Sequence, residues 1–415
     1  MDIQHHKNNV PSKYDILIKY YILTSVATYI PFYHISKTLI EGSILICIPY
    51  LISRRSQIKS SLPQLKTSVC AILVYALAFL IAFFMTGEEK DLKYFLGSLR
   101  IMLPVCLIYL AASVSDTIRL KHLGYAFSAG LILTFCLVIT PWYDSGFAAR
   151  ITRGTNLLLI YGAAVAATIM MAIVLLREAN NKTGKLVLLL ALLTGLAALF
   201  ASGAKGAILA LVITLPLITL IYIRDKKFLI TSSVLLAGIL IVIFAQPSLR
   251  AKAQTALNQV SAYINNPNTN VRSSQGIRLD MWKNTAQSIW SEPFSIRGDS
   301  RLKEIFSDQI NEGKFPKHIG RFPHVHNDYL QAWLARGPLG FFSLLALLLL
   351  PFITGLSKQT QAVAVSLAAV YALASMTNVP MLHSYSLRYY LLCMLLLLAI
   401  DKTSRQAPYH SSIDQ

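Results

Sequence analysis

The stretch Phe322–Gly340 reads FPHVHNDYLQAWLARGPLG and places polar and titratable side chains directly before the chain resumes an apolar pattern. Pro323 is suited to the first turn of a helix, so the sequence predicts a helix that begins there. Two histidines follow, and because His324 and His326 lie two residues apart, only one of them can share the main face of that helix. We assign this face to His326, since its companions recur at helical spacing. These companions are Tyr329, Leu330 and Trp333.

The composition around this stretch is that of a membrane protein. The chain has 415 residues, of which 55% are hydrophobic and only 14% are charged, and its mean hydropathy is positive. These values favour a protein that crosses the bilayer several times over a soluble enzyme. The formal net charge of +19 does not point to nucleic acid, because the basic residues are scattered among short loops and form no stripe with interleaved aromatics.

The sequence predicts an all-α protein with about twelve transmembrane helices, from apolar runs long enough to cross the hydrocarbon core. The runs lie near 16–33, 38–52, 67–86, 94–113, 122–141, 155–176, 185–202, 206–223, 228–246, 339–356, 359–376 and 383–400. Basic loops occur at 54–66, 119–122, 177–185 and 224–227, and a basic tail at 401–406. By the positive-inside rule both termini lie in the cytoplasm. We therefore expect three regions: helices 1–9 in residues 1–246, one large periplasmic loop in 247–338, and helices 10–12 with a cytoplasmic tail in 339–415.

The large loop is predicted to form a small helical subdomain. Its segment Gly276–Trp290 has apolar residues at Ile277, Met281 and Ile289, a pattern typical of an amphipathic helix packed on one side.

Two motifs in this loop resemble a known family. The first is GIRLDMW, Gly276–Trp282, and the second is HNDYLQAWLARGPLG, His326–Gly340. The second motif has the form His-Asn, nine residues, Gly, two residues, Gly. On a large loop of a protein with about twelve spans, these motifs are similar to those of the O-antigen ligases of Gram-negative bacteria. We expect Gly337 and Gly340 to let the helix approach a neighbouring backbone.

The resemblance implies a glycosyltransferase of the GT-C type in the bacterial inner membrane, with its active site facing the periplasm. Such an enzyme transfers a glycan from undecaprenyl pyrophosphate onto a sugar hydroxyl of lipid A-core, without a metal or another cofactor. Direct displacement at the anomeric carbon predicts inversion. The related O-antigen polymerases and O-oligosaccharyltransferases share the layout and the donor, and both remain alternatives. A transporter of a small anion is a further alternative, although no paired broken helices in two related halves stand out.

The transfer needs a base near the acceptor hydroxyl. His326 fits this role, since an imidazole with an ordinary pKa of about 6.5 can be neutral and basic near neutral pH; the alternative is a histidine that only caps the helix. Asp328 is a second candidate base with a lower ordinary pKa, and is otherwise a solvated acid at a helix N-terminus. Asn327 is expected to orient the loop.

The transfer also needs positive charge at the leaving pyrophosphate. Arg278 of the first motif is the leading candidate, because a guanidinium binds two phosphate oxygens at once. Lys205 lies in SGAKGA, Ser202–Ala207, where ligases usually have an arginine. Further candidates are Arg388 and Arg100, which lie within predicted spans and either line a polar groove or extend to the surface. Arg150 and Arg153 are weaker candidates, and Trp282 either shields the site or packs.

The sequence contains no motif of a metal-dependent transferase or of a nucleotide-driven one. It has no pair of aspartates separated by one residue, no HExxH, no CxxC and no P-loop. The energy for the transfer would then come from the pyrophosphate-linked donor itself.

Overall fold

A computed structural model describes residues 11–147, 149–152, 158–176, 179, 181–223, 226–245, 247–266, 273–299, 302–313, 317 and 322–406. These residues form helices and connecting segments, with no β-strand among them. The helices are α1 (Lys13–Ala27), α2 (Tyr33–Ser53), α3 (Arg55–Ile58), α4 (Leu62–Thr86), α5 (Glu89–Ser115), α6 (Leu120–Asp144), α7 (Leu158–Leu176), α8 (Lys182–Ser202), α9 (Lys205–Ile218) continued by the π-helix η1 (Thr219–Ile223), α10 (Lys226–Ala245), α11 (Pro247–Asn265), α12 (Ser274–Ser291), α13 (Leu302–Asn311), α14 (Asp328–Leu348), α15 (Leu350–Ile353), α16 (Lys358–Ser375) and α17 (Ser384–Gln406).

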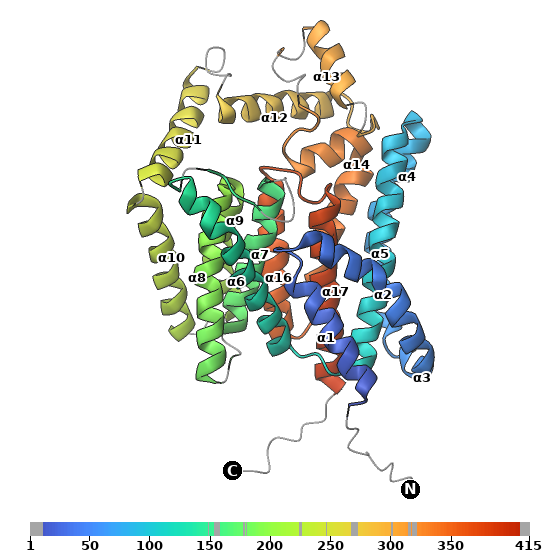
Figure 1. Ribbon diagram of the computed structural model, residues 1–415. Coiled ribbons are helices and arrows are strands. Elements are labelled where there is room, and N and C mark those ends of the chain that lie inside the picture. The colour runs from blue at the N-terminus through green and yellow to red at the C-terminus, as the bar shows by residue number, and fades with distance from the viewer. Residues whose placement is uncertain are drawn as a thin grey trace.

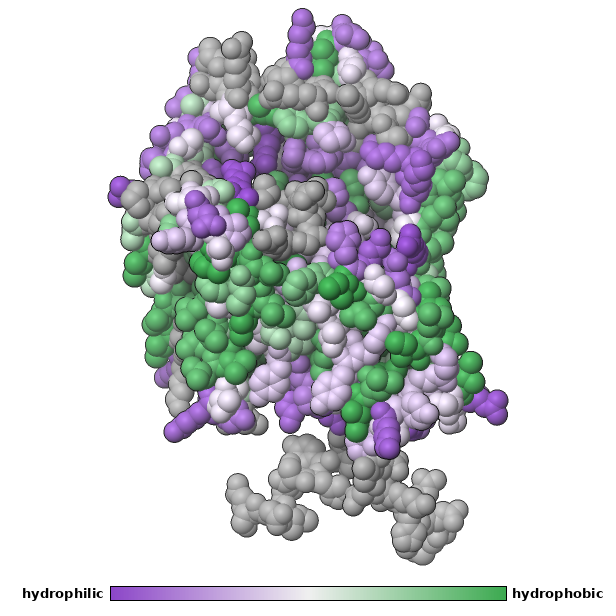
Figure 2. Space-filling model, viewed as in Figure 1, coloured by the Kyte–Doolittle hydropathy of each residue, from purple (hydrophilic) through white to green (hydrophobic). Residues whose placement is uncertain are grey.

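The long helices form a bundle with two distinct ends (Figure 1). Helices α11, α12 and α13 lie at one end, here called the loop end, whereas α1 begins and α17 ends at the other. Almost all side chains of α7 and α17 are buried, so these two helices form the centre of the bundle. The flanks carry a band of hydrophobic residues, and hydrophilic residues gather above it at the loop end (Figure 2).

Each of the twelve predicted spans overlaps a helix, although the span 339–356 falls on the second half of α14 and on α15. Within the described residues, nine of these helices are long and apolar enough to cross a membrane, namely α2, α4, α5, α6, α7, α8, α9 with η1, α14 and α17. The other three predicted spans correspond to α1, α10 and α16. An all-helical, multi-pass membrane protein is thus confirmed.

A small apolar core fastens the loop end together. Met281 of α12, Phe306 of α13 and Val325 of the histidine segment pack with Leu334 and Ala335 of α14. The predicted amphipathic helix is thus present as α12, and its apolar side faces this core.

Helix α14 is two helices joined by a kink. Gly337 has φ 64° and ψ −164°, a conformation that a residue with a Cβ rarely adopts. A Cβ at Gly340 would lie 2.5 Å from the Ala332 carbonyl oxygen, in the first half of the same helix. The expected close approach therefore occurs across the kink of α14.

The predicted start of this helix at Pro323 is wrong. The helix begins at Asp328, five residues later, because the Asn327 side chain caps it by accepting hydrogen bonds from the N–H groups of Tyr329 and Leu330. His326 lies before the cap with φ 52°, outside the helical region. His326 therefore belongs to the segment before α14 and, contrary to the prediction from the sequence, does not share a helical face with Tyr329, Leu330 and Trp333.

Candidate active site

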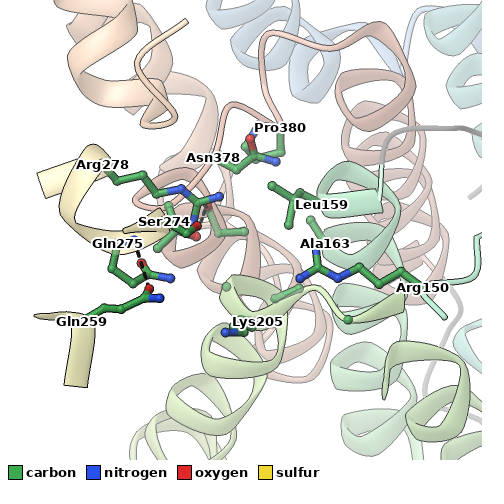
Figure 3. Close-up of a pocket in the computed structure, with 15 residues that line it drawn as sticks. Arg150, Leu159, Ala163, Lys205, Gln259, Ser274, Gln275, Arg278, Asn378 and Pro380 are labelled. Carbon is green, nitrogen blue, oxygen red and sulfur yellow. Dashed lines mark hydrogen bonds between the residues drawn. The ribbon is translucent and has the colours of Figure 1, made fainter. Parts of the chain in front are cut away.

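A pocket of about 150 Å³ lies at the loop end, where α7, α9, α12 and the connection between α16 and α17 meet. We call it the cation pocket. Its polar lining comes from Arg150, Lys205, Gln259, Ser274, Gln275, Arg278, Thr377 and Asn378. Arg278 and Arg150 extend toward it from opposite sides, and Lys205 approaches from α9 (Figure 3). No acidic side chain is among the described residues that line it.

Two helix N-termini strengthen the positive character of this pocket. Lys205 is the first residue of α9, and Ser274 and Gln275 belong to the first turn of α12. The backbone N–H groups of a first helical turn have no partner within the helix, and the helix dipole places partial positive charge there. In α12 the N–H of Gln275 already donates to Gln259 Oε1 and that of Gly276 to Ser273 Oγ, so this terminus contributes chiefly through its dipole. With three cationic side chains, the pocket is suited to a polyanion.

The cations are held close together by tight backbone packing. The N–H of Ile151 donates to the Ala201 carbonyl at 2.9 Å, which fastens the segment carrying Arg150 to the end of α8. A Cβ at Gly203 would lie 3.1 Å from the Arg150 side chain, and a Cβ at Gly206 would lie 2.1 Å from Thr377 Oγ1. The glycines beside Lys205 thus allow Arg150 and the α16–α17 connection to approach α9.

Arg278 is half-buried, and within the described residues no carboxylate pairs with it. Burial and, after it, the charge of Arg150 lower the pKa of the Arg278 guanidinium from its ordinary value. The guanidinium remains charged, because an arginine pKa starts far above physiological pH. Two cations that line the same pocket, with no acidic side chain among its described lining, repel one another, and an anionic ligand would relieve this repulsion.

The histidine segment next to this pocket is held by several hydrogen bonds. Trp282 Nε1 donates to the Val325 carbonyl at 2.9 Å, and Gln331 Oε1 accepts from the Val325 N–H at 3.1 Å. Asn327 Nδ2 donates to the Met376 carbonyl at 3.1 Å. Trp282 therefore supports the segment that carries the histidine, and Asn327 orients it in addition to capping α14.

These contacts fix the backbone conformation of His326. A residue other than glycine at φ 52° occupies a sparsely populated conformation that the surroundings must enforce. Its Nδ1 is buried and has no hydrogen-bond partner among the described residues. Backbone strain combined with an unpaired ring nitrogen is unusual for a residue that only packs, and is typical of a functional site.

The pKa of His326 is lowered to about 4, chiefly by burial and also by the charge of Arg278, while the Asn378 side chain opposes the shift. The imidazole is therefore neutral near neutral pH and can accept a proton. His326 does not itself line the cation pocket, but Arg278 and Asn378 do. These two residues connect the histidine to the pocket.

Asp328 is not a solvated acid. It is 3% exposed, and its carboxylate accepts hydrogen bonds from Ser375 Oγ at 2.8 Å and the Met381 N–H at 2.9 Å. Its own N–H donates to the Asn378 carbonyl at 3.0 Å. Asp328 thus fastens the start of α14 to the α16–α17 connection, which leaves His326 as the better-placed base.

Arg100 and Arg388 do not reach the cation pocket. Both line a second pocket, and both pair with one carboxylate, since Glu41 accepts from Arg100 at 2.9 Å and from Arg388 at 3.1 Å. Arg388 also donates to the Tyr33 hydroxyl at 3.0 Å. Their expected role beside the pyrophosphate is therefore not supported by this arrangement. Arg153 lies outside the described residues.

Several residues of the site were not singled out from the sequence. Asn378 and Thr377 lie between two apolar spans, and this polar pair in MTNVP was the available signal. Gln259 was not distinguished from other polar residues of the loop. Among the described residues, no group of three or more His, Cys, Asp or Glu side chains is arranged to hold a metal ion.

The fold and site define a multi-pass helical membrane protein with a cation-lined pocket next to a histidine of lowered pKa. A sequence profile of the family described as O-antigen ligase matches residues 188–345, from α8 to α14. This match confirms the expected resemblance of that segment to the O-antigen ligases. It includes Lys205, Arg278 and His326, whereas Arg150 and Asn378 lie outside it.

A relative in Haemophilus influenzae is an uncharacterized protein, 25% identical over 243 residues. The alignment covers 56% of this chain and 59% of the relative. The chain thus matches somewhat more than half of the relative's length.

Proposed function

We propose that this protein is an O-antigen ligase that transfers a glycan from undecaprenyl pyrophosphate onto a hydroxyl of lipid A-core at the periplasmic face of the inner membrane. The observation that carries the proposal is the cation pocket, in which three cationic side chains and two helix N-termini converge beside His326. The family match of the surrounding segment supports the reaction class.

In this proposal the pyrophosphate of the donor occupies the cation pocket. Arg278 and Arg150 approach from opposite sides and Lys205 from α9, so negative charge developing on the leaving group is stabilised from several directions. Preorganised charge of this kind often lowers an enzyme's activation barrier more than any other single effect, because no reorganisation is needed as the bond breaks. The fixed cations supply this stabilisation without a metal ion.

His326 acts as the general base. Its neutral ring accepts the proton of the acceptor hydroxyl while the oxygen attacks the anomeric carbon, and the bond to the pyrophosphate breaks on the opposite side. The product glycan carries inverted stereochemistry, and the leaving group departs as undecaprenyl pyrophosphate. Asn378 and Arg278 line the cation pocket and also act on His326. They therefore position the donor pyrophosphate relative to the base that activates the acceptor hydroxyl.

The test is reconstitution of purified protein with undecaprenyl-pyrophosphate glycan and lipid A-core in the presence of a chelator. We expect transfer by the wild-type protein and a loss of about 10²- to 10⁴-fold for His326→Ala, the usual contribution of a general base. His122→Ala is the matched control, because His122 lies at the opposite end of the bundle, beside Lys19. Retained transfer by His326→Ala would remove the assignment of the base.

The same assay separates the ligase from its relatives. If the wild-type protein lengthens the lipid-linked glycan and leaves lipid A-core unmodified, the enzyme is a polymerase and the acceptor assignment is wrong. Retention of configuration in the product would exclude the single displacement.

A further inference from the structure

A second pocket of about 430 Å³ lies at the loop end between α2, α4, α5 and the start of α17. We call it the α5 pocket. It shares no lining residue with the cation pocket. Its cationic lining is Lys37, Lys90, Lys93, Arg100 and Arg388, and its aromatic lining is Tyr33, Tyr75, Phe79 and Tyr94.

Part of this positive charge is already neutralised. Glu41 accepts from both arginines, and the exposed Lys93 lies 3.4 Å from Glu89. Lys37 and Lys90 are half-buried and pair with no carboxylate in the part of the chain that the structure describes. The pocket therefore has an excess of positive charge concentrated at these two lysines.

The aromatic lining indicates what else the ligand contains. Lys90 lies over the ring of Tyr94, with its Nζ 5.7 Å from the ring centroid. Tyr75 and Phe79 are buried in the floor of the pocket, whereas Tyr33 and Tyr94 are half-buried and partly accessible. An aromatic side chain with an apolar face and a polar hydroxyl, such as Tyr94, suits a sugar ring. A pocket with lysines and aromatic rings at the end of membrane-spanning helices suits an anionic sugar that is attached to a lipid.

A row of histidines joins this pocket to the candidate base. His383 lines the α5 pocket, and its ring centroid lies 6.4 Å from that of His324. The His324 ring lies in turn 4.2 Å from that of His326, centroid to centroid. Lys90 is close enough to this row for its charge to contribute to lowering the pKa of both His324 and His383. A sugar anchored at Lys90 can thus extend along the row to His326.

We propose that the α5 pocket binds a phosphate group of the acceptor glycolipid and thereby brings the acceptor hydroxyl to His326. The inference rests on the proposed function, because it assigns the second substrate of the same reaction. The donor pyrophosphate fills the cation pocket, and a transferase that joins two membrane-anchored substrates needs a separate place for the other one. The α5 pocket lies at the far end of the histidine row and has the complementary charge.

The test is equilibrium binding of lipid A-core to the full chain in detergent, with native lipid A-core and with the same material after enzymatic dephosphorylation. The variants are Lys37→Gln, Lys90→Gln and the double substitution, and the control is Lys283→Gln, an exposed lysine of α12 outside both pockets. Each single substitution should raise the Kd for native lipid A-core about fivefold, and the double substitution at least tenfold. Dephosphorylated lipid A-core should bind more weakly to the wild-type protein and respond little to the substitutions.

Two further ligands identify the source of the phosphate. If the lysine substitutions weaken binding of undecaprenyl pyrophosphate instead, the α5 pocket belongs to the donor and the proposal is wrong. If phosphatidylglycerol displaces native lipid A-core at equal concentration, the pocket is a general site for anionic lipids and the proposal also fails.

Binding and transfer separate this inference from the proposed function. Lysine-dependent binding of phosphorylated lipid A-core without any glycan transfer would refute the ligase assignment and leave the α5 pocket as the glycolipid site. Normal transfer by the double variant with an unchanged KM for lipid A-core would refute the α5 pocket and leave the ligase assignment intact.

Discussion

The lowered pKa of His326 makes a quantitative prediction about the acid side of the pH–rate profile. A base with a pKa of about 4 is about nine-tenths neutral at pH 5, whereas an unperturbed histidine with a pKa of about 6.5 is only about one-thirtieth neutral there. Because the neutral ring is the active form, activity is present above the pKa and is lost as the pH falls through it. Wild-type kcat/KM should thus remain almost constant from pH 7 to pH 5 and fall to half near pH 4.

Substitution of Arg278 should shift the acid limb of the pH–rate profile, the range in which activity falls as His326 becomes protonated. The charge of Arg278 is one cause of the lowered His326 pKa, so Arg278→Gln should shift the limb to higher pH as well as reduce the rate. Arg150→Gln is the control, because Arg150 lines the same pocket but is not among the causes of the His326 shift. It should reduce the rate and leave the limb in place.

The bound donor should act in the same direction as the Arg278 substitution. Its pyrophosphate offsets the positive charge beside His326, so the acid limb of kcat, which reports the enzyme–substrate complex, should lie at higher pH than that of kcat/KM, which reports the free enzyme. The assay is initial-rate transfer from pH 3.5 to 8, with samples returned to pH 7 to exclude irreversible unfolding. A limb near pH 6.5, or one that Arg278→Gln leaves unmoved, would refute the electrostatic coupling.

Three further predictions test the scaffold of the site. Trp282→Phe removes the hydrogen bond to the Val325 carbonyl and should reduce kcat with little change in donor Kd, because only the histidine segment is released; an equal change in both would contradict this. Gly206→Ala places a methyl group 2.1 Å from Thr377 Oγ1 and should lower both the Tm and the donor affinity. An unchanged melting curve would contradict this, because it would show that the α16–α17 connection moves aside at no cost in stability. Asp299 of the segment after α12 forms a buried ion pair with Arg336 of α14. Asp299→Asn removes the charge that compensates Arg336 and should destabilise the protein by about 3–5 kcal/mol, measured by thermal unfolding in detergent against the exposed-acid control Glu292→Gln.

The architecture was predictable because the length of an apolar run depends only on local sequence. A run that crosses the hydrocarbon core must form a helix, since no water is present there to satisfy backbone groups. Each predicted span accordingly overlaps a helix, and nine of these helices within the described residues are long and apolar enough to cross a membrane. The start of α14 was not predictable in the same way, because Pro323 and Asn327 both suit a helix N-terminus and tertiary contacts select the latter.

The ion-pair and hydrogen-bond partners of the charged residues could not be predicted from the sequence. Arg278 and Lys205 were identified through the family motifs, and the structure brings both to one pocket. Arg100 and Arg388 looked equivalent as arginines within spans, but their common partner Glu41 lies on another helix. Asp328 looked solvated because its hydrogen-bond partners come from a connection about fifty residues further along the chain. Such pairings depend on tertiary contacts that no local pattern encodes.

The short connection between α16 and α17 contributes to both pockets. Asn378 lines the cation pocket, and His383, five residues later, lines the α5 pocket. This has a consequence for the construction of hybrid enzymes. Exchange of the segment from α11 to His326 between two homologues would carry Gln259, Ser274, Gln275 and Arg278 of the cation pocket and no lining residue of the α5 pocket, so it would alter only part of the donor pocket. Grafting residues 376–383 together with that segment would exchange one further wall of each pocket, while the cations contributed by α2, α5 and α9 would remain those of the host.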